Sequence, residues 1–475
     1  MTDSRPARRP KRRGPKRSGG PPAPKDPARR VAYDVLSAVE SRSAYANLLL
    51  PSLLRERGIA GRDAALATEL TYGALRMQGT YDAILDACVD RSLRSVDTAV
   101  LPLLRMGAHQ LLSTNIPDHA AVSATVDLAR RTVGQHRARF ANAVLRRVSA
   151  RDLEAWLEIV APQAEADPVG HLAVLHSHPR WVIEAFAAAL GEEITVDMPE
   201  TRRLLAAHNE RPQVTLAAKP GRAEVDDLVA QGAERARYSP FAAYLPEGDP
   251  AALPVVRQRR AGVQDEASQL VTLALTRVRL KGEDARWLDA CAGPGGKATL
   301  LGGLAGQRGA RLLAAELQPA RAGLVAGAVD RTINDAARVV VADSTRPPWR
   351  AGAFDRVLVD APCTGLGSLR RRPESRWRRS AESVPELVDA QRALLRSALD
   401  STRRGGVVAY VTCSPHLAET SGVVEAITSE RDDAVVLRAA DHLPEVPDVA
   451  SGNFLQFWPH RHGTDAMFLA LLRRQ

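Results

Sequence analysis

Two cysteines lie directly after apolar segments, where a strand would end. Cys363 stands in VLVDAPCTGLGS, three residues after Asp360, and Cys413 stands in VVAYVTCSPH. A thiolate is a strong nucleophile, and helix termini or nearby positive charge favour it over the thiol. A thiol, a carboxylate and a nucleotide-like cofactor together would suit one reaction, in which the thiolate attacks C6 of cytosine while Asp360 contacts N3. The ring then becomes nucleophilic at C5 and can accept a methyl group from S-adenosylmethionine.

The residues alone leave the roles of the two thiols open. A single cysteine at a strand end is most often a small buried hydrophobe, but two of them beside one predicted cofactor site favour a chemical role. DNA cytosine methyltransferases use a cysteine that follows proline as their nucleophile, and Cys363 follows Pro362. Either Cys363 or Cys413 could therefore attack the base.

A glycine-rich turn, DACAGPGGK at residues 289–297, would hold the cofactor. The turn joins a predicted strand to a predicted helix, and glycines at a helix amino terminus let the backbone approach a nucleotide-like ligand. A phosphate-binding P-loop is excluded because Cys291 and Ala298 stand where that motif needs glycine and a hydroxyl residue. Glu316 ends another apolar segment about 20 residues further on, where a ribose-binding carboxylate is expected.

Apolar segments alternate with helical patterns from about residue 263 onward. A helix is predicted at 384–403, and strands are predicted at 285–290, 311–316, 337–342, 355–360, 406–411 and 466–472. This alternation predicts an α/β fold with a mostly parallel, Rossmann-like sheet and helices on both faces. Such sheets bind ligands at the carboxyl ends of their strands. Four carboxylates fall at these ends and predict a cofactor site: Asp289, Glu316, Asp343 and Asp360.

The chain before this region divides into three further parts. Residues 27–148 show only helical periodicity and predict an all-α domain without an evident catalytic cluster. Residues 149–172 predict a linking helix and loop, and residues 173–262 mix a helix with short strands and predict a small α+β adaptor. His176 and His178 have no third ligand nearby in the sequence, so we expect them to pack or cap, and no metal site is predicted.

Most of the net charge of +10 comes from the amino-terminal tail. Residues 1–30 hold 11 of the 65 Lys and Arg but only 2 of the 55 Asp and Glu, together with seven prolines. Residues 1–26 are therefore expected to be disordered. A flexible basic arm would add affinity for nucleic acid through phosphate contacts, and an inert solubilising leader is the alternative.

Neither a secretory signal nor a membrane span is evident, and four scattered cysteines indicate reducing, cytoplasmic surroundings.

A second basic cluster, RRRPESRWRR at residues 370–379, follows Cys363. Guanidinium groups can hold phosphates, while arginine planes and Trp377 can stack on unpaired bases. A solvated run of charge is the alternative, but the closeness to Cys363 favours a grip on RNA. The target cytosine would have to be unpaired or flipped out to reach a thiol.

Three segments resemble motifs of the RNA 5-methylcytosine methyltransferases: DACAGPGGKAT, DAPCTGLGSLRRRPESRW and YVTCSPH. In that family the cysteine of the TC motif is the nucleophile and the cysteine of the PC motif assists product release. The resemblance therefore implies that Cys413 attacks C6 and that Cys363 helps to resolve the adduct. GVQDEASQLV and FWPHRHGTDAMFLALLRR are also similar to family segments, with Met467 where the family often has glycine. The resemblance assigns contact with S-adenosylmethionine to Cys291, Ala292, Gly293, Pro294, Gly295, Gly296, Lys297, Glu316, Asp343 and Asp360.

The helical part resembles the NusB-type RNA-binding domain in AALATELTYGALR, LLRMGAHQLL and IPDHAAVSATVDLAR. A NusB-like domain, an adaptor and a methyltransferase domain (263–475), in that order, is the arrangement of the Sun/RsmB small-subunit ribosomal RNA methyltransferases. The resemblance implies an S-adenosylmethionine-dependent enzyme that forms 5-methylcytosine in 16S ribosomal RNA, either bare or partly assembled. The alternatives are transfer RNA or another RNA as substrate, or a non-catalytic RNA-binding or antitermination factor. The intact pair of thiols argues against the last.

Overall fold

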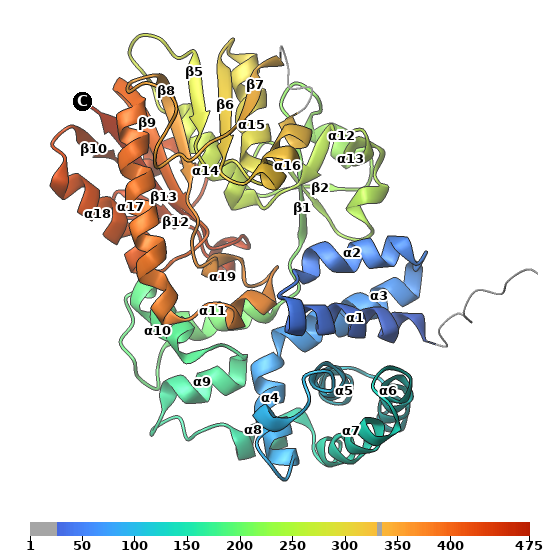
Figure 1. Cartoon of the computed structure of the whole chain (residues 1–475). Coiled ribbons are helices and arrows are strands. Elements are labelled where there is room, and N and C mark those ends of the chain that lie inside the picture. The colour runs from blue at the N-terminus through green and yellow to red at the C-terminus, as the bar shows by residue number, and fades with distance from the viewer. Residues whose placement is uncertain (1–25, 330–334) are drawn as a thin grey trace, which may run out of the picture.

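The computed structural model describes residues 26–329 and 335–475. Figure 1 shows a helical amino-terminal part and a large sheet covered by helices, with a smaller sheet beside the large one. The tail at 1–26, predicted to be disordered, lies outside the described residues except for Asp26. None of the helices among the described residues combines the length and the apolar composition that a membrane-spanning helix requires.

The amino-terminal domain is all helical, as the periodicity predicts. The first helix begins after Asp26, whose carboxylate accepts a hydrogen bond from the Arg29 N–H, and Pro27 occupies the first turn, where its missing N–H is no loss. Leu70 and Leu103, both fully buried, pack in the core between these helices. The helices are α1 (Pro27–Arg42), α2 (Ala46–Glu56), α3 (Gly61–Arg76), α4 (Gln78–Cys88), α5 (Leu101–Ser113), α6 (Asp118–Thr132) and α7 (Gln135–Val148).

Four further helices lead from this domain to the smaller sheet: α8 (Leu153–Val160), α9 (Pro168–His176), α10 (Arg180–Leu190) and α11 (Pro199–Asn209). His178 is buried between α9 and α10, where its Nδ1 lies 2.7 Å from the carbonyl oxygen of His176 and its ring lies against those of Phe186 and His208. The packing role expected for His178 is therefore confirmed.

The smaller sheet is antiparallel, with strand order β2-β3-β1-β4. Short helices α12 (Val225–Val229) and α13 (Pro254–Arg257) accompany it. Its last strand leads into the helix at Glu266–Arg277, and Gln264, between the two, lies beside Gly296 of the glycine turn. The strands are β1 (Val214–Ala218), β2 (Glu234–Arg235), β3 (Ala242–Leu245) and β4 (Ala261–Val263).

The large sheet has a parallel centre in the order β9-β8-β5-β6-β7, continued by antiparallel β13. The strand order reverses between β5 and β8, and ligands of such sheets bind at this point beyond the carboxyl ends. Each predicted strand has an observed counterpart. The strands are β5 (Arg286–Asp289), β6 (Arg311–Glu316), β7 (Ala337–Val341), β8 (Phe354–Asp360), β9 (Thr402–Thr412), β10 (Ala434–Leu437), β11 (Ala450–Ser451), β12 (Phe454–Gln456) and β13 (Phe468–Arg474).

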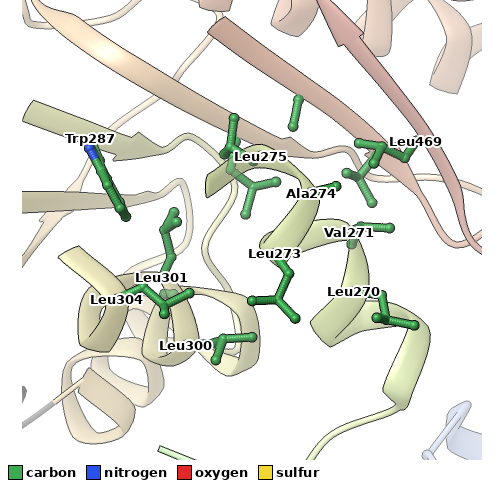
Figure 2. Close-up of a cluster of buried hydrophobic side chains, with 14 of the residues drawn as sticks. Leu270, Val271, Leu273, Ala274, Leu275, Trp287, Leu300, Leu301, Leu304 and Leu469 are labelled. Atoms are coloured by element: carbon green, nitrogen blue, oxygen red, sulfur yellow. The ribbon is translucent and has the colours of Figure 1, made fainter. Parts of the chain in front are cut away.

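Helices cover both faces of this sheet because its strands are apolar on both sides. Leu358 of β8 faces α14 (Glu266–Arg277), α15 (Gly296–Gln307) and α16 (Pro319–Val329). The neighbouring Val357 and Val359 face α17 (Val384–Ser401) and α18 (Ser421–Glu430). Figure 2 shows the first of these cores, where leucines of α14 and α15 meet Trp287 and Leu469. The predicted helices on both faces are confirmed.

The arginine-rich segment 370–379 joins the domain of the large sheet to the helical domain. Arg376 is fully buried, and its guanidinium group donates to the carbonyl oxygens of Arg76, Ser177 and His208 at 2.8–3.0 Å. Arg370 is also buried and donates to the carbonyl oxygen of Gly463. The predicted RNA grip is therefore wrong for Arg370 and Arg376, because both side chains are buried inside the protein. A sequence cannot distinguish an arginine that holds phosphates from one that holds carbonyls.

Replacing Arg376 by alanine should lower the free energy of unfolding by about 3 kcal/mol, because three buried carbonyl groups would lose their donors. The exposed Arg379 is a matched control from the same segment, and its replacement by alanine should change that free energy by less than about 0.5 kcal/mol. Urea unfolding of both variants measures the difference. Equal stabilities would show that Arg376 does not hold the domains together.

Candidate active site

The glycine turn lies between β5 and α15 and adopts a shape that only glycine allows. Gly295 has φ +113°, and a Cβ at this residue would lie 2.6 Å from the Cβ of Ala328 on α16. A Cβ on Gly293 would lie 2.1 Å from Oε2 of Glu316. The N–H of Gly293 instead donates to that oxygen at 3.0 Å. The glycines therefore bring the turn and the acid at the end of β6 into direct contact.

Two buried polar atoms beside this turn have no hydrogen-bond partner among the described residues: Oδ2 of Asp289 and Nε2 of Gln264. Asp289 is fully buried at the end of β5, and its other oxygen accepts from the Cys291 N–H at 3.3 Å. The amide of Gln264 lies within 4 Å of a Cβ position on Gly296. An unpaired acceptor and an unpaired donor at one glycine turn fit a polar ligand such as the amino-acid end of S-adenosylmethionine.

Burial, together with the nearby carboxylate of Asp360, raises the pKa of Asp289 from its ordinary value of 3.8 to about 7. Between these values the folded protein holds a proton that the unfolded chain has released. The free energy of unfolding therefore falls as pH rises from about 4 to 7. A cationic group of a ligand beside Oδ2 would stabilise the ionised carboxylate and so offset the free energy that burying this charge costs.

Asp289→Asn is expected to weaken S-adenosylmethionine binding about 10- to 100-fold, which corresponds to the usual free-energy contribution of one hydrogen bond to a charged group. The same change should leave the free energy of unfolding at pH 8 unchanged or higher, because it removes a buried charge. Calorimetric titration and urea unfolding measure the two effects. Wild-type affinity in the variant would exclude Asp289 from the cofactor site.

The two cysteines meet because their loops leave neighbouring parallel strands. Asp360 at the end of β8 pairs with Val411 near the end of β9. The loops that follow bring Sγ of Cys363 to 3.4 Å from Sγ of Cys413. Gly367 fixes this approach, since its N–H donates to the carbonyl oxygen of Cys413 and a Cβ there would overlap the Ala466 carbonyl.

Lys297, in the first turn of α15, donates to Oδ2 of Asp360 at 2.8 Å and joins the glycine turn to the cysteine loops. Burial would lower the pKa of Lys297, but the Asp360 carboxylate outweighs burial and raises it. The hydrogen bond between the two sulfurs, in which either thiol can be the donor, lowers the pKa of Cys413, and the Lys297 ammonium acts in the same direction. The same contact raises the pKa of Cys363, and burial adds to the effect. The contact is the same from either sulfur, and the Lys297 ammonium, which lowers the pKa of Cys413, favours Cys413 as the thiolate and Cys363 as the thiol.

Most of the predicted site residues gather at the carboxyl end of the sheet. The turn consists of Cys291, Ala292, Gly293, Pro294, Gly295, Gly296 and Lys297. The adjoining strand ends carry Glu316, Asp360, Cys363 and Cys413. Asp343, after β7, is exposed and accepts from the N–H and hydroxyl of Thr345. Its neighbour Ser344 ties this strand end to the turn by donating to the carbonyl oxygen of Ala290 at 2.6 Å.

Two residues of the site were missed by sequence reasoning. Gln264 belongs to the segment that marks entry to the catalytic domain, and its polar end could have been assigned to the glycine turn only from the fold. Glu419 is fully buried beside both cysteine loops. It lies in PHLAET, where no spacing or motif marks an acid as part of a site.

Groups of three or more His, Cys, Asp or Glu placed to hold a metal ion were not found among the described residues.

The strand order, the antiparallel β13, the glycine turn and the strand-end carboxylates define a Rossmann-like class I methyltransferase domain. A NusB-like helical domain and a small α+β unit precede it.

Two family matches agree with this description. Residues 277–473 match the family 16S rRNA methyltransferase RsmB/F, and residues 26–150 match the NusB family. A protein of Mycobacterium tuberculosis named as a methyltransferase is 50% identical over 98% of this chain and 99% of its own length. The ribosomal RNA small subunit methyltransferase B of Pseudomonas putida is 32% identical over 86% of this chain and 90% of its own length. The chain belongs to the family of ribosomal RNA small subunit methyltransferases B.

Solved structures share the fold. The crystal structure of PH0851 is 19% identical and superimposes with a TM-score of 0.78 over 95% of this chain and 99% of its own. NSun6 from Pyrococcus horikoshii, solved with SFG, is 18% identical, with a TM-score of 0.54 over 63% of this chain and 99% of its own. At these identities the likeness concerns the fold alone.

Proposed function

We propose that the protein forms 5-methylcytosine in 16S ribosomal RNA, with S-adenosylmethionine as methyl donor, in the cytoplasm. The observation that carries the proposal is the 3.4 Å contact between the sulfurs of Cys363 and Cys413 beside the Asp360–Lys297 pair. Family membership supports an RNA substrate, and the name of the Pseudomonas putida relative points to the small ribosomal subunit. The unpaired atoms of Asp289 and Gln264 support a polar cofactor at the glycine turn.

Cys413 is the proposed nucleophile. Its thiolate forms a bond to C6 of a flipped cytosine, and Asp360 contacts N3, so that the electron pair of the C5–C6 double bond becomes available at C5. Bound S-adenosylmethionine supplies an electrophilic methyl group for C5. Glu316 and the backbone of residues 291–297 would hold the cofactor, and Lys297 would keep Asp360 in place through their 2.8 Å contact.

Cys363 is the proposed partner in product release. After methylation the C5 proton must pass to water or another base, the electron pair of that C–H bond must re-form the C5–C6 double bond, and the bond from C6 to the Cys413 sulfur must break. The sulfur leaves as a thiolate, and the Cys363 S–H at 3.4 Å can stabilise it by a hydrogen bond. Without that donor the leaving thiolate would be less stable and the adduct would persist.

The helical domain and the basic tail are the parts of the chain proposed to bind RNA. Residues 27–148 form the proposed RNA-binding domain, 149–172 the linker, 173–262 the adaptor and 263–475 the methyltransferase domain, while the basic tail at 1–26 adds affinity through phosphate contacts. Removing residues 1–25 tests the role of the tail, because the truncated protein should bind RNA more weakly and with a smaller dependence on salt concentration.

Transfer of labelled methyl from S-adenosylmethionine to purified 16S ribosomal RNA, followed by nucleoside analysis, tests the proposed function. Labelled 5-methylcytosine in that RNA is the expected result. Transfer only to a transfer RNA pool would keep the chemistry and change the substrate. RNA binding without transfer to either RNA would favour a non-catalytic binding factor.

A further inference from the structure

The carboxylate of Glu419 lies between the two cysteine loops and contacts both of them. Its Oε1 accepts from the N–H of Thr364, and its Oε2 accepts from the hydroxyl of the same residue, at 2.8 and 2.5 Å. Oε2 also accepts from the hydroxyl of Ser414 at 2.6 Å. Thr364 directly follows Cys363 and Ser414 directly follows Cys413. A single buried side chain is therefore bonded to the residue after each thiol.

Glu419 is itself held from two further elements. The amide Nε2 of Gln391, on α17, donates to Oε1 of Glu419 at 3.1 Å and to the carbonyl oxygen of Pro362 at 2.8 Å. The hydroxyl of Tyr410, buried within β9, donates to the backbone carbonyl of Glu419 at 2.8 Å. Four donors on a carboxylate that has no exposed surface make a site with little freedom to move.

We propose that Glu419 is a positioning residue that holds the sulfurs of Cys363 and Cys413 at their working separation. No other described side chain hydrogen-bonds both residues that follow the thiols. The Gly367 N–H also bonds the carbonyl oxygen of Cys413, and the hydroxyls of Thr364 and Ser414 lie 3.0 Å apart, so Glu419 completes a set of contacts between the two loops. A displacement of about 1 Å in a reacting group can cost on the order of 100-fold in rate. Glu419 touches neither the base nor the cofactor in this role and acts only through the loops.

This inference rests on the proposed function for its effect on turnover, but the thiol geometry can be tested without RNA. Phenylarsine oxide condenses with two neighbouring thiols, forming two As–S bonds and releasing one water without any change in oxidation state. Wild-type protein should bind one arsenical at the cysteine pair, and Cys413→Ser should not. Mass spectrometry of intact protein and competition with a small dithiol give the affinity.

Three variants probe the linkage: Glu419→Ala, Glu419→Gln and Ser414→Ala. Glu419→Ala should weaken arsenical binding and lower kcat by about 100-fold or more, while the KM for S-adenosylmethionine stays within about threefold. Glu419→Gln keeps the size of the side chain and one acceptor oxygen, so a smaller loss is expected. The double change Glu419→Gln with Ser414→Ala should cost less than the two single losses combined, because both remove the same contact.

Asp355→Asn is the matched control. Asp355 is also fully buried and accepts from the N–H groups of Ala285 and Arg286 and from Arg403, but it lies at the opposite end of β8 from the cysteine loops. This variant should lose stability as the Glu419 variants do, yet keep wild-type arsenical affinity.

Unchanged arsenical binding in Glu419→Gln and Ser414→Ala would overturn the inference, even if Glu419→Ala fails to fold. Loss of arsenical affinity in Asp355→Asn would also overturn it, since a general loss of packing would then suffice. Weakened arsenical binding in the Glu419 variants supports the inference whether or not the wild-type protein methylates 16S ribosomal RNA, so the failure of one proposal is distinguishable from the failure of the other.

Discussion

Replacing Cys413 by alanine is expected to abolish both methyl transfer and the covalent complex with RNA. The bond from sulfur to C6 is the step that makes C5 nucleophilic, and without it the base has little tendency to accept a methyl group. The expected loss in kcat/KM is about 10⁴-fold or more, as for removal of other covalent nucleophiles. Binding of S-adenosylmethionine should change little, because the turn and its carboxylates are untouched. Labelled-methyl transfer and denaturing gel electrophoresis with labelled RNA measure the two losses.

Cys88→Ala is a useful control for this experiment, because it removes a buried thiol of the helical domain and leaves the catalytic loops unchanged. It should keep near-wild-type turnover. Residual covalent complex in Cys413→Ala would assign the attack to Cys363, the alternative that the residues alone leave open.

Replacing Cys363 by alanine should have a different result: an RNA–protein complex that survives denaturation should accumulate. The nucleophile remains, so the bond to C6 can form. The S–H that would stabilise the departing sulfur at 3.4 Å is gone, and loss of such a group typically slows a step about 10²- to 10⁴-fold. The fraction of protein cross-linked after incubation with RNA and cofactor should rise well above that of the wild type.

The double variant Cys363→Ala with Cys413→Ala distinguishes this result from nonspecific cross-linking, because it should form no complex at all. Equal, complex-free loss of activity in both single variants would contradict the division of roles. The contrast between the single variants is therefore more informative than either loss of activity alone.

The sequence by itself determined the local structure of this protein, that is, which segments form strands, helices and the glycine turn. The apolar segments before Asp289, Glu316 and Asp360 predicted strands that the structure contains, and the alternation with helices predicted a parallel sheet. Gly293 and Gly295 marked the turn, because only glycine tolerates the backbone and the close neighbours found there. These features depend on residues near one another along the chain, and their patterns can be read directly.

The tertiary structure decided which of those residues meet and what the polar ones do. Cys363 and Cys413 are 50 residues apart, and only the parallel pairing of β8 with β9 brings their sulfurs to 3.4 Å. Arg376 resembled an RNA contact in the sequence, but it donates to three carbonyls at a domain junction. Glu419 carried no signal, yet it contacts both cysteine loops. A charged or polar side chain has the same sequence pattern whether its partner is solvent, RNA or backbone, and the fold alone determines which partner lies within reach.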